Sequence, residues 1–138
     1  MYNIDPKIWG QVGWDFLFYI ALSYPDNPSL EEQNNMKNFL INMGKVLPCE
    51  KCRFNFSEHL KKYPINNLTL QNRNNLTNWL INVLNEIRVQ NGKRKMTYEE
   101  IVNKYIKNKN TPINFHLLYI SSLIIIIIAL IIFIKFKY

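Results

Sequence analysis

The chain has very few of the residues that usually build metal sites. It contains only two cysteines and two histidines among 138 residues. A structural zinc site needs four ligands, so it would require Cys49, Cys52, His59 and His116 together, although His116 stands at the edge of a long apolar run. We therefore predict no metal site, and a zinc-binding adaptor that uses both cysteines is kept as the weakest alternative.

The sequence also lacks the signals of β-structure. No segment alternates apolar and polar residues with the period of a strand, and no internal repeat is visible. A thioredoxin-like fold would place a Cys-x-x-Cys pair between strands and helices, so that fold is not expected. The predicted fold class is all-α.

Two helices are predicted in the first third of the chain. Apolar residues recur at helical spacing over 8–21, and Pro25 ends this helix because proline disfavours helical backbone in the residue before it. Ser29 and Glu32 have the spacing of a capping box, which predicts the start of a second helix running to Leu47.

Three further helices follow. A third is expected from Pro48, in the first turn, to Tyr63. A fourth covers 76–87 and ends near Gly92, a residue suited to a left-handed C-terminal cap. A capping box at Thr97 starts a short fifth helix that extends to Tyr105. The expected architecture is a four-helix bundle with a short fifth helix, over residues 1–107.

One long apolar run stands near the C-terminus. Residues 117–134 carry no charge and number about 18, which at roughly 1.5 Å per residue approaches the hydrocarbon thickness of a bilayer. Its position argues against a signal peptide. We predict a linker over 108–114, a single transmembrane helix over 115–134 and a short basic tail over 135–138.

The charge of the chain is basic and unevenly distributed. Lysine and arginine outnumber acidic residues by 17 to 10, and the basic residues gather between Arg88 and Lys109. Positive charge that runs into a membrane helix is typical of attraction to anionic lipid headgroups. We therefore expect a membrane partner and no nucleic acid.

Cys49 and Cys52 concentrate all the thiol chemistry of the chain. Residues three apart on a helix share a face, so the sulfurs can form a disulfide or present two thiols to one partner. Placement near a helix N-terminus favours the thiolate, which makes Cys49 the better nucleophile candidate. Spacing alone leaves redox, metal-binding and inert structural roles open.

The residues around the pair carry a family resemblance. The segments 9–18 and 47–52, then Trp79, 85–88 and 92–93, resemble the Erv/ALR family of FAD-linked sulfhydryl oxidases in order and spacing. Trp14, both cysteines and Asn85 match family positions. The chain departs at Phe18 and Leu84, where histidines are expected, and at Arg88, where a second asparagine is expected.

The resemblance implies an FAD site within the helical bundle. Phe18 can stack where an imidazole would stand, and Arg88 and Lys93 suit the pyrophosphate. The expected cofactor contacts are Trp9, Gly10, Trp14, Phe18, Trp79, Leu84, Asn85, Arg88 and Lys93. The resemblance further implies that a substrate thiolate attacks Cys49, the more accessible sulfur, while Cys52 faces the flavin and O2 is reduced to hydrogen peroxide.

The absence of a third cysteine restricts the partners. Many relatives carry an additional shuttle pair, and this chain does not, so a protein dithiol, such as a thioredoxin-like carrier, is expected to reach Cys49 directly. A non-covalent homodimer is expected. The composition suggests a large DNA virus, and the C-terminal span suggests a tail-anchored protein whose catalytic domain faces the cytosol or virion interior. The main alternative is a flavin-free, membrane-anchored helical interaction protein.

Overall fold

The computed structural model describes residues 2–107 and, beyond them, residues 119–120, 123–124, 126, 132 and 134. The part of the chain so described is helical and contains no strand, which confirms the all-α prediction. Its elements are α1 (Pro6–Ser23), α2 (Leu30–Val46), α3 (Glu50–Lys62), α4 (Arg73–Gln90) and α5 (Tyr98–Val102), followed by a π-helical turn, η1 (Asn103–Lys107).

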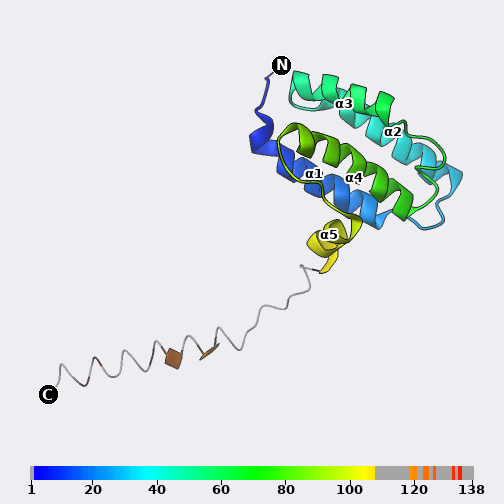
Figure 1. The fold of residues 1–138 in the computed structure, drawn as a ribbon. Coiled ribbons are helices and arrows are strands. Elements are labelled where there is room, and N and C mark those ends of the chain that lie inside the picture. Colours follow the sequence, from blue (N-terminus) through cyan, green and yellow to red (C-terminus); the bar gives the residue numbers. More distant parts are fainter. Residues whose placement is uncertain are drawn as a thin grey trace. The chain divides into compact units, whose positions relative to one another are not determined.

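The four long helices pack as two pairs. Helix α1 lies beside α4, and α2 lies beside α3 (Figure 1). Apolar side chains of α1 and α4 form the centre of the core, with Phe18, Leu76 and Val83 almost completely buried. Residues Met1–Tyr105 make up one compact unit. The predicted bundle of four helices with a short fifth is thereby confirmed.

The predicted helix caps are present. Ser29 and Glu32 form a capping box before α2, and Thr97 forms a second one before α5. Helix α4 ends at Gln90, and Gly92 just beyond its C-cap has a left-handed φ of 68°, while the amide of Lys93 donates to the carbonyl of Arg88 at 2.8 Å. Glycine adopts this backbone without the steric cost of a Cβ atom.

The start of α3 differs from the prediction. Pro48 lies outside the helix, which begins at Glu50 with Cys49 as its N-cap. Cys49 has extended backbone, with φ −126° and ψ 125°, and its Sγ accepts a hydrogen bond from the amide of Cys52 at 3.2 Å. The sulfur therefore satisfies an amide of the first helical turn, a task that usually falls to a serine or aspartate oxygen.

The apolar face of α1 is divided between core and solvent. Leu17, Phe18 and Ala21 are buried, whereas Ile8, Val12 and Phe16 are 74%, 69% and 57% exposed. The last three lie four residues apart, so they form one stripe along the helix. This stripe is called the α1 stripe below.

The C-terminal region, Ile106–Tyr138, forms a second unit. Of the predicted membrane helix over 115–134, the described residues 119–120, 123–124, 126, 132 and 134 are helical. Among residues that the structure describes, no helix is both long and apolar enough to cross a bilayer. The predicted linker over 108–114 and tail over 135–138 lie outside the described residues, and the membrane helix stays a prediction.

Candidate active site: a disulfide in the wall of an apolar cavity

Cys49 and Cys52 are joined in a disulfide at the N-terminus of α3, with their Cα atoms 5.0 Å apart. Neither thiol is therefore available to a metal in this state. The amide of Cys52, which donates to Cys49 Sγ, and the positive end of the α3 dipole both favour negative charge on the sulfur. The local backbone thus stabilises a thiolate when the pair is reduced.

The disulfide borders a cavity of about 650 Å³ between the helices. Its wall is mostly apolar and aromatic, and it takes residues from the start of α1, the ends of α2 and α4, and one face of α3. The lining includes Trp9, Gly10, Trp14, Leu47, Phe56, His59 and Ile87, together with both cysteines. A bulky, flat, largely apolar group is the kind of ligand that such a cavity accepts.

Three of the predicted cofactor residues line this cavity, namely Trp9, Gly10 and Trp14. Gly10 has open space beside it, because a Cβ atom built there meets, apart from its chain neighbours and the backbone of its own helix, no heavy atom of the described residues within 4 Å. Both indole rings are only partly buried. These side chains are thus arranged to contact a bound aromatic group.

Three other predicted residues are packed in the core. Phe18 is completely buried and stacks on Tyr105, with ring centroids 5.2 Å apart. Trp79 and Leu84 are also buried, and the Trp79 indole donates to the carbonyl of Tyr63 at 2.9 Å. None of the three is among the residues lining the cavity beside the disulfide, and their roles as cofactor contacts stay predictions.

The polar residues predicted on α4 organise the connection between α4 and α5. The Asn85 amide donates to the carbonyl of Met96 at 2.8 Å and accepts from its backbone N–H at 2.7 Å. Arg88 Nε donates to the carbonyl of Arg94 at 2.7 Å, and Lys93 is exposed. Contacts of Asn85, Arg88 and Lys93 with a cofactor likewise stay predictions.

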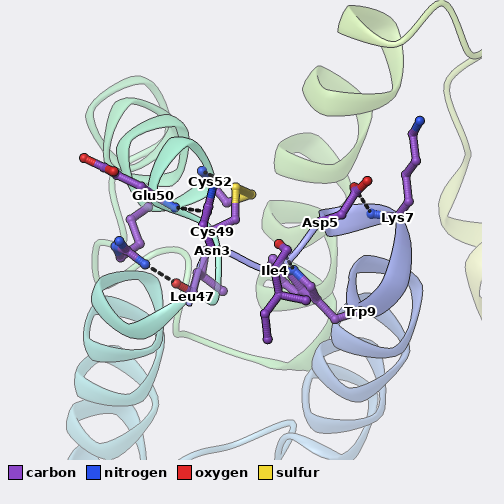
Figure 2. The surroundings of a disulfide bond; sticks show 10 residues. Asn3, Ile4, Asp5, Lys7, Trp9, Leu47, Cys49, Glu50 and Cys52 are labelled. Atoms are coloured by element: carbon purple, nitrogen blue, oxygen red, sulfur yellow. Dashed lines mark hydrogen bonds between the residues drawn. A yellow bond between two sulfur atoms is a disulfide. The ribbon is translucent and has the colours of Figure 1, made fainter. Parts of the chain in front are cut away.

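An N-terminal strap, residues 2–5, covers the loop before α3. Asn3 Oδ1 accepts from the amide of Glu50 at 3.1 Å, and the amide of Ile4 donates to the carbonyl of Pro48 at 2.9 Å. The Trp9 indole donates in turn to the carbonyl of Ile4 at 3.2 Å. Figure 2 shows the strap passing between the disulfide end of α3 and the start of α1.

The predicted accessibility of the two cysteines is wrong. Cys49 is buried, with 6% of its surface exposed, whereas Cys52 is partly exposed. The more accessible residue of the pair is thus Cys52, opposite to the prediction. Asn3 and Ile4 are hydrogen-bonded to the loop that carries Cys49, and both cysteines border the cavity.

His59 is a residue of the site that is absent from the predicted cofactor contacts and that the sequence pattern alone places on the surface of its helix. It is only 5% exposed and lines the cavity, and its Nε2 is buried without a hydrogen-bond partner among the described residues. Burial lowers the pKa of the imidazole, and the charge of Glu86 partly opposes this shift. The available signal was spacing, because Phe56 and His59 follow Cys52 by four and seven residues and share its helix face.

The fold and the site define a class: a helical bundle with a redox-capable disulfide in the wall of a cofactor-sized cavity. The profile of the Erv1/Alr family matches residues 11–107, and the chain belongs to this family. It is 35% identical over 109 residues to a "Probable FAD-linked sulfhydryl oxidase" of Acanthamoeba polyphaga mimivirus, covering 79% of this chain and 76% of that protein.

Other relatives agree with this assignment. The FAD-linked sulfhydryl oxidase of African swine fever virus is 28% identical, over 70% of this chain and 79% of its own length. The crystal structure of the yeast Erv1 core superimposes with a TM-score of 0.68 at 23% identity, covering 77% of this chain and 87% of that one. That structural likeness concerns the fold.

Proposed function

We propose that the protein is an FAD-linked thiol oxidase that forms disulfides in protein dithiols and delivers the electrons to dioxygen, giving hydrogen peroxide. The observation that carries the proposal is the Cys49–Cys52 disulfide in the wall of the 650 Å³ cavity. Membership of the Erv1/Alr family supports thiol oxidation and FAD as the cofactor. Dioxygen as the final acceptor is our inference from the family resemblance.

The residues present fit a flavin. The cavity offers an apolar aromatic wall with two indoles and open space at Gly10, and its lining includes His59, whose buried Nε2 lacks a partner in the described part of the chain. Trp9, Trp14 and Phe56 would hold the ring system by aromatic and apolar contact. When bound, FAD supplies the two-electron acceptor that reoxidises the cysteine pair and passes the electrons to oxygen.

The chain's own residues perform the thiol exchange. As the family resemblance implies, a substrate thiolate attacks Cys49 Sγ, although Cys49 is the less exposed residue of the pair, so the strap of residues 2–5 must first uncover it. The sulfur–sulfur bond breaks, and Cys52 leaves as a thiolate at the N-terminus of α3. The second substrate thiolate attacks the substrate sulfur of this mixed disulfide and releases Cys49. The substrate leaves with a disulfide, and its two electrons remain on the reduced Cys49 and Cys52.

Colour and oxygen uptake of the purified full-length chain in detergent test the proposal. We expect a yellow protein that consumes oxygen when given a dithiol, with at least a hundredfold loss of turnover in Cys49→Ser and in Cys52→Ser, because each removes an exchange step. Full turnover by Cys49→Ser would contradict its assignment as the attacked sulfur. A colourless protein with zinc would instead support the adaptor, and a colourless, metal-free protein would support the interaction scaffold.

The substrate is proposed to be a protein dithiol that reaches Cys49 without an intermediate shuttle. The sequence holds no cysteine beyond this pair, so no second dithiol in the chain can relay electrons. A thioredoxin-like carrier has two adjacent thiols on a compact surface and suits this requirement. Faster oxygen uptake with such a carrier than with an equal concentration of glutathione is the expected result.

We also infer a non-covalent homodimer and a membrane anchor. The exposed α1 stripe of Ile8, Val12 and Phe16 supports the homodimer, because an apolar row on a surface helix is typical of an interface.

The uncharged run over 117–134 supports the membrane anchor. With microsomes, protease should digest the N-terminal domain if it faces the cytosol, and full protection would reverse the orientation.

A further inference from the structure

His59 is the one histidine among the described residues, and it has an unusual position. It lies on α3 on the same face as Cys52 and Phe56, and all three line the cavity. Only 5% of the residue's surface is exposed, and its Nε2 has no hydrogen-bond partner among residues 2–107 and the other described positions. A buried polar atom without a partner costs about 1–3 kcal/mol, so the position calls for an explanation.

The neighbouring protein groups do not supply the partner. Glu86 is the acidic group whose charge acts on His59, but Glu86 Oε1 accepts from Lys62 Nζ at 2.8 Å. Its second oxygen accepts from the hydroxyl of Tyr63 at 3.1 Å. Both carboxylate oxygens are therefore engaged with other side chains, and the nearby positive charge of Lys62 disfavours an imidazolium. The imidazole is held neutral, in which state one ring nitrogen donates and the other accepts.

We propose that His59 is a cofactor-positioning residue, whose imidazole forms a hydrogen bond to a polar atom of the isoalloxazine ring system when FAD fills the cavity. The inference rests on the proposed function and concerns the same site. A carbonyl oxygen or ring nitrogen of the flavin would give Nε2 the partner that the protein withholds. The free-energy cost of the unpartnered nitrogen is then present only in the cofactor-free chain and disappears when FAD binds.

This arrangement gives His59 a signature that a merely structural residue would not have. In His59→Leu the unpartnered nitrogen is removed, so the cofactor-free chain should keep its thermal stability or gain some. The same change should weaken FAD binding about three- to tenfold, the value of one hydrogen bond. His59→Gln, which can still donate and accept, should recover most of the affinity. Stability and affinity thus change in opposite directions.

The experiment uses the full-length chain in detergent, stripped of flavin and titrated with FAD while flavin fluorescence is followed. Kd is compared among the unaltered chain, His59→Leu, His59→Gln and Ser57→Leu. The last is a matched control, because Ser57 is exposed on the same helix. In parallel, the ring-nitrogen resonances of His59 are followed by NMR on addition of FAD, with His116 as the reference signal from the chain's other histidine.

The expected result is that the His59 resonance shifts on addition of FAD and that, among the three variants, only His59→Leu binds FAD clearly more weakly. Equal Kd values for the unaltered chain and His59→Leu, or a His59 resonance that ignores FAD, would overturn this role while leaving the oxidase proposal intact. Failure of the unaltered chain to bind FAD at all would overturn both.

Discussion

Gly44 lies at a point of the site where no larger residue fits. It is buried where α2 lies against α3, and a Cβ atom built there would approach Cε1 of Phe56 to 2.6 Å. Phe56 also lines the cavity. The close approach of the two helices, and the position of one cavity wall, therefore require glycine at this point of α2.

We expect Gly44→Ala to destabilise the protein by about 1–3 kcal/mol, because overlap with the Phe56 ring outweighs the gain in helix propensity of about 1 kcal/mol. Urea unfolding measures this effect. Gly10→Ala is the matched control: nothing lies within 4 Å of its added Cβ, so it should leave stability unchanged or raise it. Equal effects at both positions would contradict the packing argument.

His59 also predicts a pH dependence of stability. Its pKa in the folded chain is lowered by burial from the ordinary value near 6.5. As the pH falls below 6.5 the unfolded chain binds a proton that the folded chain does not, so the free energy of unfolding decreases, by at most about 1.4 kcal/mol per pH unit.

Urea unfolding of the flavin-free chain between pH 7.5 and 5.5 checks this slope. His59→Gln has no titrating ring and should show a flatter dependence. Hydrogen bonds lower the pKa of the carboxyls of Glu32, Glu86 and Glu100, in the last case to about 2. Their contribution to the free energy of unfolding is therefore lost only at lower pH. An unchanged slope in His59→Gln would assign the effect to another group.

At the scale of elements, the site is built around the N-terminus of α3. The helix brings the disulfide to the cavity, and the strap of residues 2–5 covers the preceding loop through Asn3 and Ile4. Because the strap is held by hydrogen bonds from exposed residues, it is tied down weakly. We therefore expect that opening of the strap, at small cost, increases access to Cys49.

Asn3→Ala removes the acceptor of the Glu50 amide and should loosen the strap. We expect faster reduction of the Cys49–Cys52 disulfide by a small phosphine or thiol, by about two- to tenfold, with global stability lowered by less than about 1 kcal/mol. Mass spectrometry after timed alkylation measures the rate. Asn82→Ala, at an exposed position on α4, is the control and should react at the rate of the unaltered chain.

At the scale of the whole molecule, the α1 stripe predicts how copies of the chain associate. Val12 is 69% exposed between Ile8 and Phe16, so a charge at this position would lie at the centre of an apolar interface. Val12→Glu should convert the proposed dimer to a monomer, as measured by light scattering, because burying an unpaired carboxylate is strongly unfavourable. Val89→Glu, at an exposed position of α4, should leave the mass unchanged. A monomeric unaltered chain would contradict the proposal.

Features that depend on neighbours close in the sequence could be predicted from the sequence alone. The capping boxes at Ser29 and Thr97 and the left-handed Gly92 depend on interactions within a few residues, and all three predictions are confirmed. The prediction that the first helix ends before Pro25 is also confirmed. The start of α3 was misplaced because the sulfur of Cys49, rather than a typical oxygen, caps it.

What the sequence determined by itself is therefore local and chemical: the helices, most of their caps and the family, whereas the state of the two cysteines was left open until the structure showed their disulfide. Which apolar residues of a helix remain exposed, and which polar ones are buried, was decided only by tertiary structure, because that depends on segments distant in the chain. The strap over Cys49, the exposure of the α1 stripe and the burial of His59 are the clearest cases. In each, a side chain with an ordinary local pattern acquires its role from neighbours that helical spacing cannot reveal.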